Sequence, residues 1–324
     1  MKARRGVALL AALWLVVAIA TVALQFSLEA HERRSVGLLV SERGVQRAAD
    51  VGALALLQAK LDYALRVAPT ARSAAQLRAS DPWLDIDSVY SGTWYIDSMP
   101  VDVQARDLGE QLNINQLTEN DLQTFFSYLL KDYEKATQLA QCIMDWRDAD
   151  SIPRPSGAER DAYIKADMLA LPTNSQFREV SELRDVMGMT PEIYALVSPY
   201  LTTRGSGMVN LNTAPAPVLR VLPGMTDQIL MMILELRSQG RRIANVSDVL
   251  PQAPAVARGN PAAVARAART RARTLAQLST RATTTTDMVE LTILSRTGPQ
   301  AQPSRLIADV RRANGSATIA YKSW

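Results

Sequence analysis

The feature that most constrains this chain is an apolar run near its N-terminus, residues 7–24, which contains no charged side chain. A run of this length can cross a bilayer as a helix. Lys2, Arg4 and Arg5 precede it, and positive charges favour retention of that end in the cytoplasm. The sequence therefore predicts one membrane-spanning helix, with the remainder of the chain on the far side of the membrane.

A single glycine, Gly6, separates the basic leader from the apolar run. The run is longer than the apolar core of an ordinary signal peptide. This arrangement resembles the class III leader of type IV pilins and pseudopilins, which implies that a prepilin peptidase cuts after Gly6 and methylates the new N-terminus at Val7. Most such subunits carry Glu five residues after the cut, whereas this chain has Ala11. The departure indicates either a plain signal anchor or a subunit with no neighbour ahead of it in a filament.

The helix is expected to continue well past the apolar run. Residues 27–67 contain no proline, and Pro69 ends the pattern. Apolar residues in the second half recur on one side at helical spacing; they are Val51, Leu54, Leu57, Leu61, Ala64 and Leu65. A continuous helix would be about 90 Å long, with its first half in membrane or filament and its second half packed against a folded head.

Strand-like segments occur in two blocks that lie far apart in the sequence. The first block comprises residues 93–96, 101–103 and 112–115, and the second comprises residues 288–294, 306–312 and 317–321. Asn314-Gly315 in the second block is a strong hairpin signal. The two blocks predict one antiparallel sheet in an α+β fold, with a helical insert between its halves.

The insert is expected to be built from short helices with Pro-, Gly-, Ser- and Asn-rich connectors. The expected helices are 119–131, 135–147, 181–187, 191–197, 216–222 and 226–239. Two segments, 112–118 and 209–215, look alike, which indicates a weak internal echo rather than a repeat array. Residues 251–286, rich in Ala, Arg and Thr, are expected to form a mobile insertion with one helix over 262–278.

Charge is unevenly distributed along a chain whose net charge is +4. Residues 81–167 are strongly acidic, whereas residues 241–281 carry eight arginines against one acid, Asp248. The basic stretch is either a solvated linker or a surface for nucleic acid or an acidic partner. A single cysteine, Cys142, excludes an intramolecular disulfide and a Cys-cluster zinc site. The only histidine, His31, lies just beyond the apolar run, which argues against a Ser-His or Cys-His nucleophile pair.

The best candidate site is a cluster of acids that begins near the end of the second expected helix. Its members are Asp145, Asp148, Asp150, Glu159 and Asp161. Asp148, Asp150 and Glu159 fall at positions 1, 3 and 12 of a calcium-binding loop, and hard oxygen ligands suit Ca²⁺. Ile152 and Pro153 stand where an EF-hand needs a ligand and a glycine. The cluster is therefore either an irregular calcium site or a set of helix caps and solvated loop acids.

Residues 209–239 resemble a helix-hairpin-helix unit. DNA-binding versions use a Gly-x-Gly hairpin to donate backbone N–H groups to phosphate. The hairpin here, residues 223–227, lacks the second glycine and ends on Asp227. Residues 177–200 read as a similar unit with an equally non-basic turn. Both units favour a scaffold role over DNA binding.

With these pieces in order, the chain resembles the protein K family, the large minor pseudopilins of type II secretion. The matching motifs are the Gly6 leader with Ala11, Asp145-Trp-Arg-Asp-Ala-Asp with Pro153-Arg-Pro and Gly157-Ala-Glu, Glu182-Leu-Arg before Gly188-Met-Thr-Pro-Glu, and Val209-Asn-Leu-Asn-Thr-Ala-Pro. The resemblance implies a type IV pilin-like fold, a long N-terminal helix plus an antiparallel sheet, with a large inserted helical domain. The expected segments are a leader (1–6), a transmembrane and stalk helix (7–68), a head (69–115 and 287–324), the helical insert (116–250) and a flexible insertion (251–286).

The same resemblance implies a non-enzymatic subunit at the tip of a periplasmic pseudopilus, anchored in the inner membrane by one pass. Such a subunit would initiate or cap assembly and support export of folded proteins. The implied partners are the minor pseudopilins I and J, with H, prepilin peptidase, and secreted cargo or the outer-membrane secretin; no nucleic acid is expected. The resemblance also implies Ca²⁺ in the insert. Two alternatives stay open, a membrane-tethered helix-hairpin-helix receptor for DNA uptake and a tethered periplasmic enzyme.

Overall fold

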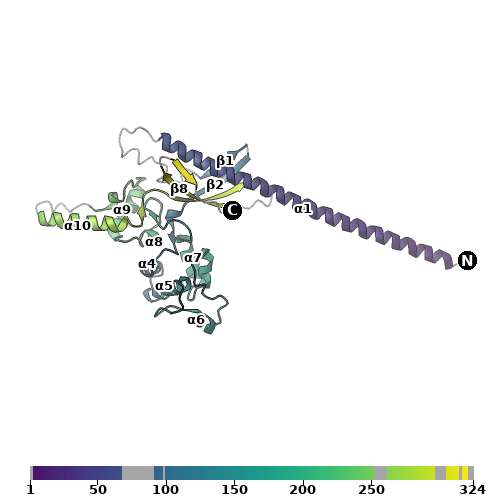
Figure 1. Cartoon of the computed structure of the whole chain (residues 1–324), viewed down its shortest axis with the longest axis horizontal. Helices are drawn as coiled ribbons and strands as arrows, with labels where there is room; N and C mark the ends of the chain where they lie inside the picture. Colours follow the sequence, from purple (N-terminus) through teal and green to yellow (C-terminus); the bar gives the residue numbers. More distant parts are fainter. Residues whose placement is uncertain are drawn as a thin grey trace.

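The computed structural model describes residues 3–67, 91–97, 99–251, 261–295, 304–313 and 316–319. One long helix, a five-stranded sheet and a helical insert make up this part of the chain (Figure 1). The predicted helix end at Pro69 and the predicted hairpin turn at Asn314-Gly315 lie outside the described residues.

Helix α1 runs from Ala3 to Val67 and projects far beyond the rest of the molecule (Figure 1). Large apolar side chains in its first half are exposed, among them Trp14 at 72% and Leu24 at 60%. By length and composition, the part Ala12–Leu57 contains a stretch that is long and apolar enough to cross a membrane. A contiguous apolar surface of this kind marks a membrane or protein contact. The projecting half of α1 is therefore expected to be buried in a membrane or against another protein.

The second half of α1 packs on the sheet. Leu54 and Leu57 are buried there, as predicted, but Val51 is 45% exposed, so the predicted stripe is wrong at that position. The helix instead turns small residues to the sheet: a Cβ atom on Gly52 would lie 2.7 Å from Cγ2 of Ile96. The residues buried between helix and sheet are Ala49, Ala53, Leu54, Leu57, Trp94, Val101, Val103, Ala105, Val289, Leu291 and Ile293.

The sheet joins strands from both ends of the sequence, which confirms the predicted antiparallel sheet. Its strands are β1 (Gly92–Ile96), β2 (Met99–Asp107), β7 (Met288–Ser295), β8 (Ser304–Ala313) and β9 (Ser316–Ile319), in the order β1-β2-β7-β8-β9. The central pair, β2 and β7, sets Asp107 opposite Val289. The chain therefore leaves the sheet and returns to it at one end of two neighbouring strands.

The predicted strand at 112–115 does not belong to this sheet. The 3-10 helix η2 (Leu108–Glu110) carries the chain out of the sheet first. Strand β3 (Leu112–Asn113) then pairs in parallel with β4 (Leu201–Thr202) inside the insert. A two-residue strand takes its partner from long-range packing, which its own sequence does not encode.

The insert contains most of the helices. They are α4 (Glu119–Leu130), α5 (Tyr133–Arg147), α6 (Arg160–Lys165), η3 (Val180–Asp185), α7 (Pro191–Val197), η4 (Ser198–Tyr200), α8 (Ala216–Leu219), α9 (Asp227–Ser238), η5 (Val246–Val249) and α10 (Pro261–Leu278). The predicted helix at 181–187 is a 3-10 helix, and the one at 216–222 ends early at Leu219. The insert has its own hydrophobic core, in which Phe125, Phe126 and Trp146 are buried.

The insert consists of two similarly built halves, here called the first lobe (residues 112–203) and the second lobe (residues 209–284). Each begins with a short strand that pairs in parallel with the strand at its end, β3 with β4 and β5 (Val209–Asn210) with β6 (Ala282–Thr283). The last residue of the first strand is an asparagine whose Oδ1 accepts a hydrogen bond from the backbone N–H two residues on, at 3.0 Å in both lobes. The two similar sequence segments, 112–118 and 209–215, therefore form the beginnings of two related folding units.

An arginine near the end of the second helix ties each lobe together in the same way. Arg147 in α5 donates to the carbonyl groups of Ile114 and Leu117. Arg237 in α9 donates to the carbonyl groups of residues 213–214. In both lobes a half-buried arginine donates to the main-chain acceptors that follow the first strand, and its partial burial lowers its pKa.

The second part of the stretch 251–286, predicted to be a mobile insertion, is instead packed into the second lobe. Leu278 and Ala282 are buried. Arg271 in α10 donates to the carbonyl groups of Ser247 and Leu250, at 2.9 and 3.1 Å. The predicted helix at 262–278 is present as α10.

Asp107 locks the insert to the sheet. It is fully buried at the end of β2. Its carboxylate accepts hydrogen bonds from the Gly109 backbone N–H at 2.8 Å, from Asn210 Nδ2 at 2.6 Å and from Thr213 Oγ1 at 2.8 Å. Burial raises the pKa of this carboxyl group, and the hydrogen bonds from these three donors and from Thr286 oppose that rise. One side chain of the sheet thereby holds the start of the second lobe.

Candidate metal centre

Three of the predicted calcium ligands come together in the first lobe. Asp148 directly follows α5, Asp150 lies two residues further along the same loop, and Glu159 occupies the N-cap position of α6. One carboxylate oxygen from each lies within 4.8 Å of the other two. The loop between two helices thus returns Glu159 to the acids at its beginning.

The donor atoms fit a hard divalent cation. Ca²⁺ binds carboxylate oxygens at about 2.3–2.6 Å, so two ligands of one ion lie up to about 5 Å apart. Asp148 Oδ1 and both oxygens of Glu159 are buried without a hydrogen-bond partner among the described residues. Glu159 is only 6% exposed. Burying an unpartnered carboxylate is costly, and a bound cation would remove that cost.

The electrostatics of the loop also favour a cation. Arg154 Nη1 lies 2.5 Å from Asp145 Oδ1 and 2.6 Å from Asp148 Oδ2. It supplies one positive charge beside four carboxylates, those of Asp145, Asp148, Asp150 and Glu159. Burial, followed by repulsion from Asp145 and Asp148, raises the pKa of Glu159. The negative charge that Arg154 does not neutralise includes that of the unpartnered oxygens of Asp148 and Glu159.

Asp145 and Asp161 do not join the group of three acids. Asp145 is fully buried, and Arg154 engages both of its oxygens, one through Nη1 and the other through the backbone N–H at 3.1 Å. Asp161 is exposed in the first turn of α6. Asp145 therefore fixes the loop, and the sequence analysis missed its partner Arg154. The available signal was that Arg154, alone among the three arginines of residues 145–161, lies between two prolines.

Gly157 allows the loop to close over Asp145. A Cβ atom at this position would overlap the Asp145 carboxylate. The Gly157 backbone N–H donates to the Arg154 carbonyl at 3.0 Å, which closes the turn. Trp146, which follows Asp145 in the sequence, packs on Phe177 with nearly parallel rings whose centroids are 6.2 Å apart. Asp145 is thus next in sequence to a buried, closely packed residue.

The other predicted site residues have no part in this centre. Gly6, Val7 and Ala11 lie on the projecting part of α1. Cys142 is buried in α5, and burial together with the charge of Asp145 raises the pKa of its thiol to about 11. A thiol that stays protonated near neutral pH is a packing residue rather than a nucleophile.

The hairpin of the helix-hairpin-helix-like unit is covered by α10. Gly224 in that hairpin has a φ of +79°, and its Cα faces Gln277, whose Cβ would lie 3.0 Å from an added Cβ. Asp227 pairs with Arg220 beside the same turn. The face that would meet a phosphate group in a DNA-binding unit is therefore occupied by protein and carries an acid.

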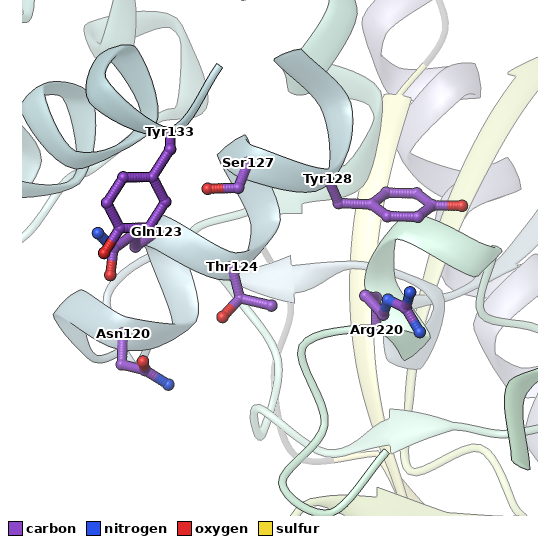
Figure 2. A pocket seen from close by; sticks show the side chains of 7 residues that line it. All are labelled: Asn120, Gln123, Thr124, Ser127, Tyr128, Tyr133 and Arg220. Atoms are coloured by element: carbon purple, nitrogen blue, oxygen red, sulfur yellow. The ribbon is translucent and has the colours of Figure 1, made fainter. Parts of the chain in front are cut away.

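A shallow pocket of about 500 Å³ lies beside α4, where the two lobes meet. Figure 2 shows the polar side of α4 along one wall and Arg220 of the second lobe across from it. The lining residues are Asn120, Gln123, Thr124, Ser127, Tyr128, Tyr133 and Arg220. No carboxylate, imidazole or thiol from the described residues lines it, so the pocket offers hydrogen bonds but no general acid or base near neutral pH.

Comparison with known proteins identifies the first lobe most clearly. Residues 110–205 match the family model of type II secretion system protein K. The matched range coincides closely with the first lobe (residues 112–203), which contains the acidic loop.

Several curated proteins match a part of the chain. The chain is 32% identical over 94 residues to type II secretion system protein K of Pectobacterium carotovorum subsp. carotovorum, covering 27% of this chain and 29% of that protein. It is 34% identical over 97 residues to protein K of Dickeya chrysanthemi, covering 28% and 26%. It is 31% identical over 153 residues to protein K of Aeromonas hydrophila, covering 40% and 45%. The matches thus span less than half the length of these relatives.

A solved structure extends the similarity to the fold of nearly the whole chain. It belongs to the GspK-GspI-GspJ complex from the type 2 secretion system of enterotoxigenic Escherichia coli. The match has a TM-score of 0.59 at 18% identity and covers 88% of this chain and 98% of that chain. A pilin-like head with a large helical insert is common to both. The chain is therefore similar to type II secretion system protein K over residues 110–205, and nearly the whole chain is similar in fold to a chain of the GspK-GspI-GspJ complex.

Proposed function

We propose that this protein is a non-enzymatic minor pseudopilin at the tip of the type II secretion pseudopilus. In that place it initiates or caps assembly and supports export of folded proteins across the outer membrane. The observation that carries the proposal is the two-lobed insert on a pilin-like head. Pilin shafts pack their heads closely around a core of N-terminal helices, and an insert of this size would clash with the neighbours in a shaft. At a tip there is no subunit above to clash with.

The exposed first half of α1 supports an anchor in the inner membrane with the head in the periplasm. The related structure is a complex with GspI and GspJ, which supports minor pseudopilins I and J as partners here. Pseudopilin H, prepilin peptidase, and cargo or the secretin complete the proposed set. Ala11 supports the tip position, because a terminal subunit has no neighbour above it whose amine needs a carboxylate.

The N-terminus tests the proposal directly. Protein isolated from membranes is expected to begin at an N-methylated Val7, measured by intact mass and N-terminal sequencing. The same protein from cells lacking prepilin peptidase, the control, is expected to keep Met1. An intact Met1 in both strains would contradict a pseudopilin role. Co-purification with co-expressed pseudopilins I and J tests the tip complex itself.

We also propose that Asp148, Asp150 and Glu159 bind Ca²⁺ in the first lobe. Glu159→Gln is expected to weaken calcium binding at least about tenfold, because ligand charge sets the affinity of such sites. Asp161→Asn removes an equal charge from an exposed position nearby and is expected to leave affinity unchanged. Isothermal titration calorimetry on the full chain in detergent measures both. Equal losses in the two variants would point to a general charge effect and contradict the site.

The pH dependence of calcium binding follows from the raised pKa of Glu159. Without a cation, this group favours the folded state below the ordinary carboxyl pKa, and that contribution is lost as pH rises through the raised value. Ca²⁺ requires the ionised form, so its affinity rises with pH over the same window. The increase in melting temperature caused by calcium is therefore expected to be larger at about pH 7 than at about pH 5. Glu159→Gln should abolish this difference.

A further inference from the structure

Helix α10 has one face that is built into the second lobe. Leu278 is buried there, and Gln277 lies against Gly224. Arg271 points to the same side and donates to the carbonyl groups of Ser247 and Leu250. The contacts of this face attach α10 to the rest of the second lobe.

The opposite face carries three arginines with no structural task. Arg266, Arg269 and Arg273 are exposed. At about 100° per residue they fall within about 60° of arc, on the side opposite Arg271. Among the described residues, no ion pair or side-chain hydrogen bond engages any of the three. Like charges so close together do not stabilise the fold, so the stripe has another use.

The stripe belongs to a lobe whose charge is opposite to that of its twin. The first lobe contains fourteen acidic and eight basic residues, whereas the second lobe contains three acidic and ten basic residues. Two units with the same architecture therefore carry net charges of opposite sign. Because the architecture does not demand this difference, it points to different partners for the two lobes.

The position of α10 favours a protein over a membrane as the partner. Figure 1 shows α10 at one end of the molecule and the N-terminus of α1, with its apolar exposed half, at the other. Lipid headgroups around that half of α1 are out of reach of α10. Helices that lie in a membrane surface also need bulky apolar side chains to insert. Val264, at 40%, is the only large exposed apolar side chain on α10 among the described residues.

The spacing of the stripe favours a helical partner. Arg266, Arg269 and Arg273 follow one another by three and four residues, the spacing of a helix–helix seam. Ala265 and Ala272 flank them on one side and are exposed. Small side chains beside the arginines leave room for a second helix to approach, so that its carboxylates can reach the guanidinium groups.

We propose that the outer face of α10 is a docking surface for an acidic α-helical segment of a partner protein. Arg266, Arg269 and Arg273 pair with its carboxylates, while Arg271 and Gln277 hold α10 in place. The binding itself does not depend on the proposed role in secretion. Only the location of the partner, beyond the pseudopilus tip, rests on that role.

The test measures binding of a fluorescently labelled helical peptide of Glu and Ala to the full chain in detergent. The variant Arg266→Gln/Arg269→Gln/Arg273→Gln is expected to bind at least about tenfold more weakly, because it removes three cation–carboxylate contacts. The matched control, Arg160→Gln/Lys165→Gln/Arg178→Gln, removes three exposed positive charges from the first lobe and should bind as the wild type does. Thermal unfolding verifies that both variants fold.

Two results would overturn the proposal. One is an equal affinity of the stripe variant and the control variant for the peptide. The other is tighter, stripe-dependent binding to vesicles of phosphatidylglycerol and phosphatidylethanolamine, or to duplex DNA, than to the peptide. A start at Met1 in membrane-derived protein would remove the role in secretion without affecting this measurement, so the two failures can be told apart.

Discussion

Replacing Asp107 with alanine is expected to lower the free energy of unfolding by about 3–4 kcal/mol. The substitution leaves three donors without an acceptor: the Gly109 N–H, the Asn210 amide and the Thr213 hydroxyl. Asn210 is fully buried, so water cannot replace the lost acceptor. The sheet and the second lobe then lose the hydrogen bonds from Asn210 and Thr213 that Asp107 accepts between them. Thermal unfolding measures the loss, and limited proteolysis between residues 107 and 112 detects the loosened junction.

Asp102→Ala provides the matched control on the same strand. Its carboxylate accepts a hydrogen bond from Thr93 at an exposed position, where water can take over. A loss of less than about 1 kcal/mol is expected. If the two alanine variants unfold alike and resist protease alike, Asp107 does not lock the insert to the sheet.

Gly157→Ala is expected to cost about 2–3 kcal/mol of stability and to weaken calcium binding at least about tenfold. The new Cβ atom would overlap the Asp145 carboxylate. Asp145 cannot move aside easily, because both of its oxygens are held by Arg154. The loop must therefore shift, and Arg154 carries Asp148 with it. Thermal unfolding and calorimetric titration with Ca²⁺ measure the two effects.

The neighbouring substitution Ser156→Ala is the control for Gly157→Ala. Ser156 is exposed, and its backbone N–H, which the substitution retains, donates to Gln141 at 2.6 Å. Stability and calcium affinity should stay at the wild-type level. A Gly157→Ala protein as stable as this control, with unchanged affinity, would refute the close approach to Asp145.

The fold could be predicted where local pattern decides structure. The strand blocks at 93–103 and 288–294 alternate with period two, and they pair as expected. Two of the predictions that failed show the physical reasons. Val51 was placed in the buried stripe because large apolar residues were counted, whereas α1 meets the sheet through small residues such as Gly52. Strand β3 was placed in the wrong sheet because two residues do not specify a partner.

In the candidate site, too, local sequence spacing predicted some features, while others depend on how the chain folds. The spacing of Asp148, Asp150 and Glu159 predicted that these carboxylates gather, and they do. The role of Asp145 could not be predicted, because its partner Arg154 is chosen by how the loop folds. The sequence showed only a weak echo between the lobes, because much of their relation resides in hydrogen bonds from side chains to main-chain carbonyl groups, such as those of Arg147 and Arg237.

The exit and return of the insert at the ends of β2 and β7 have a mechanical consequence. A force applied to the insert along the strands acts on β2 and β7 in the same direction. Their own ladder is then not strained, and the load falls as shear on the ladders with β1 and β8. In shear, all hydrogen bonds of a ladder bear the load together instead of opening one after another. The head can therefore transmit thrust or tension between α1 and the insert without its central strands peeling apart.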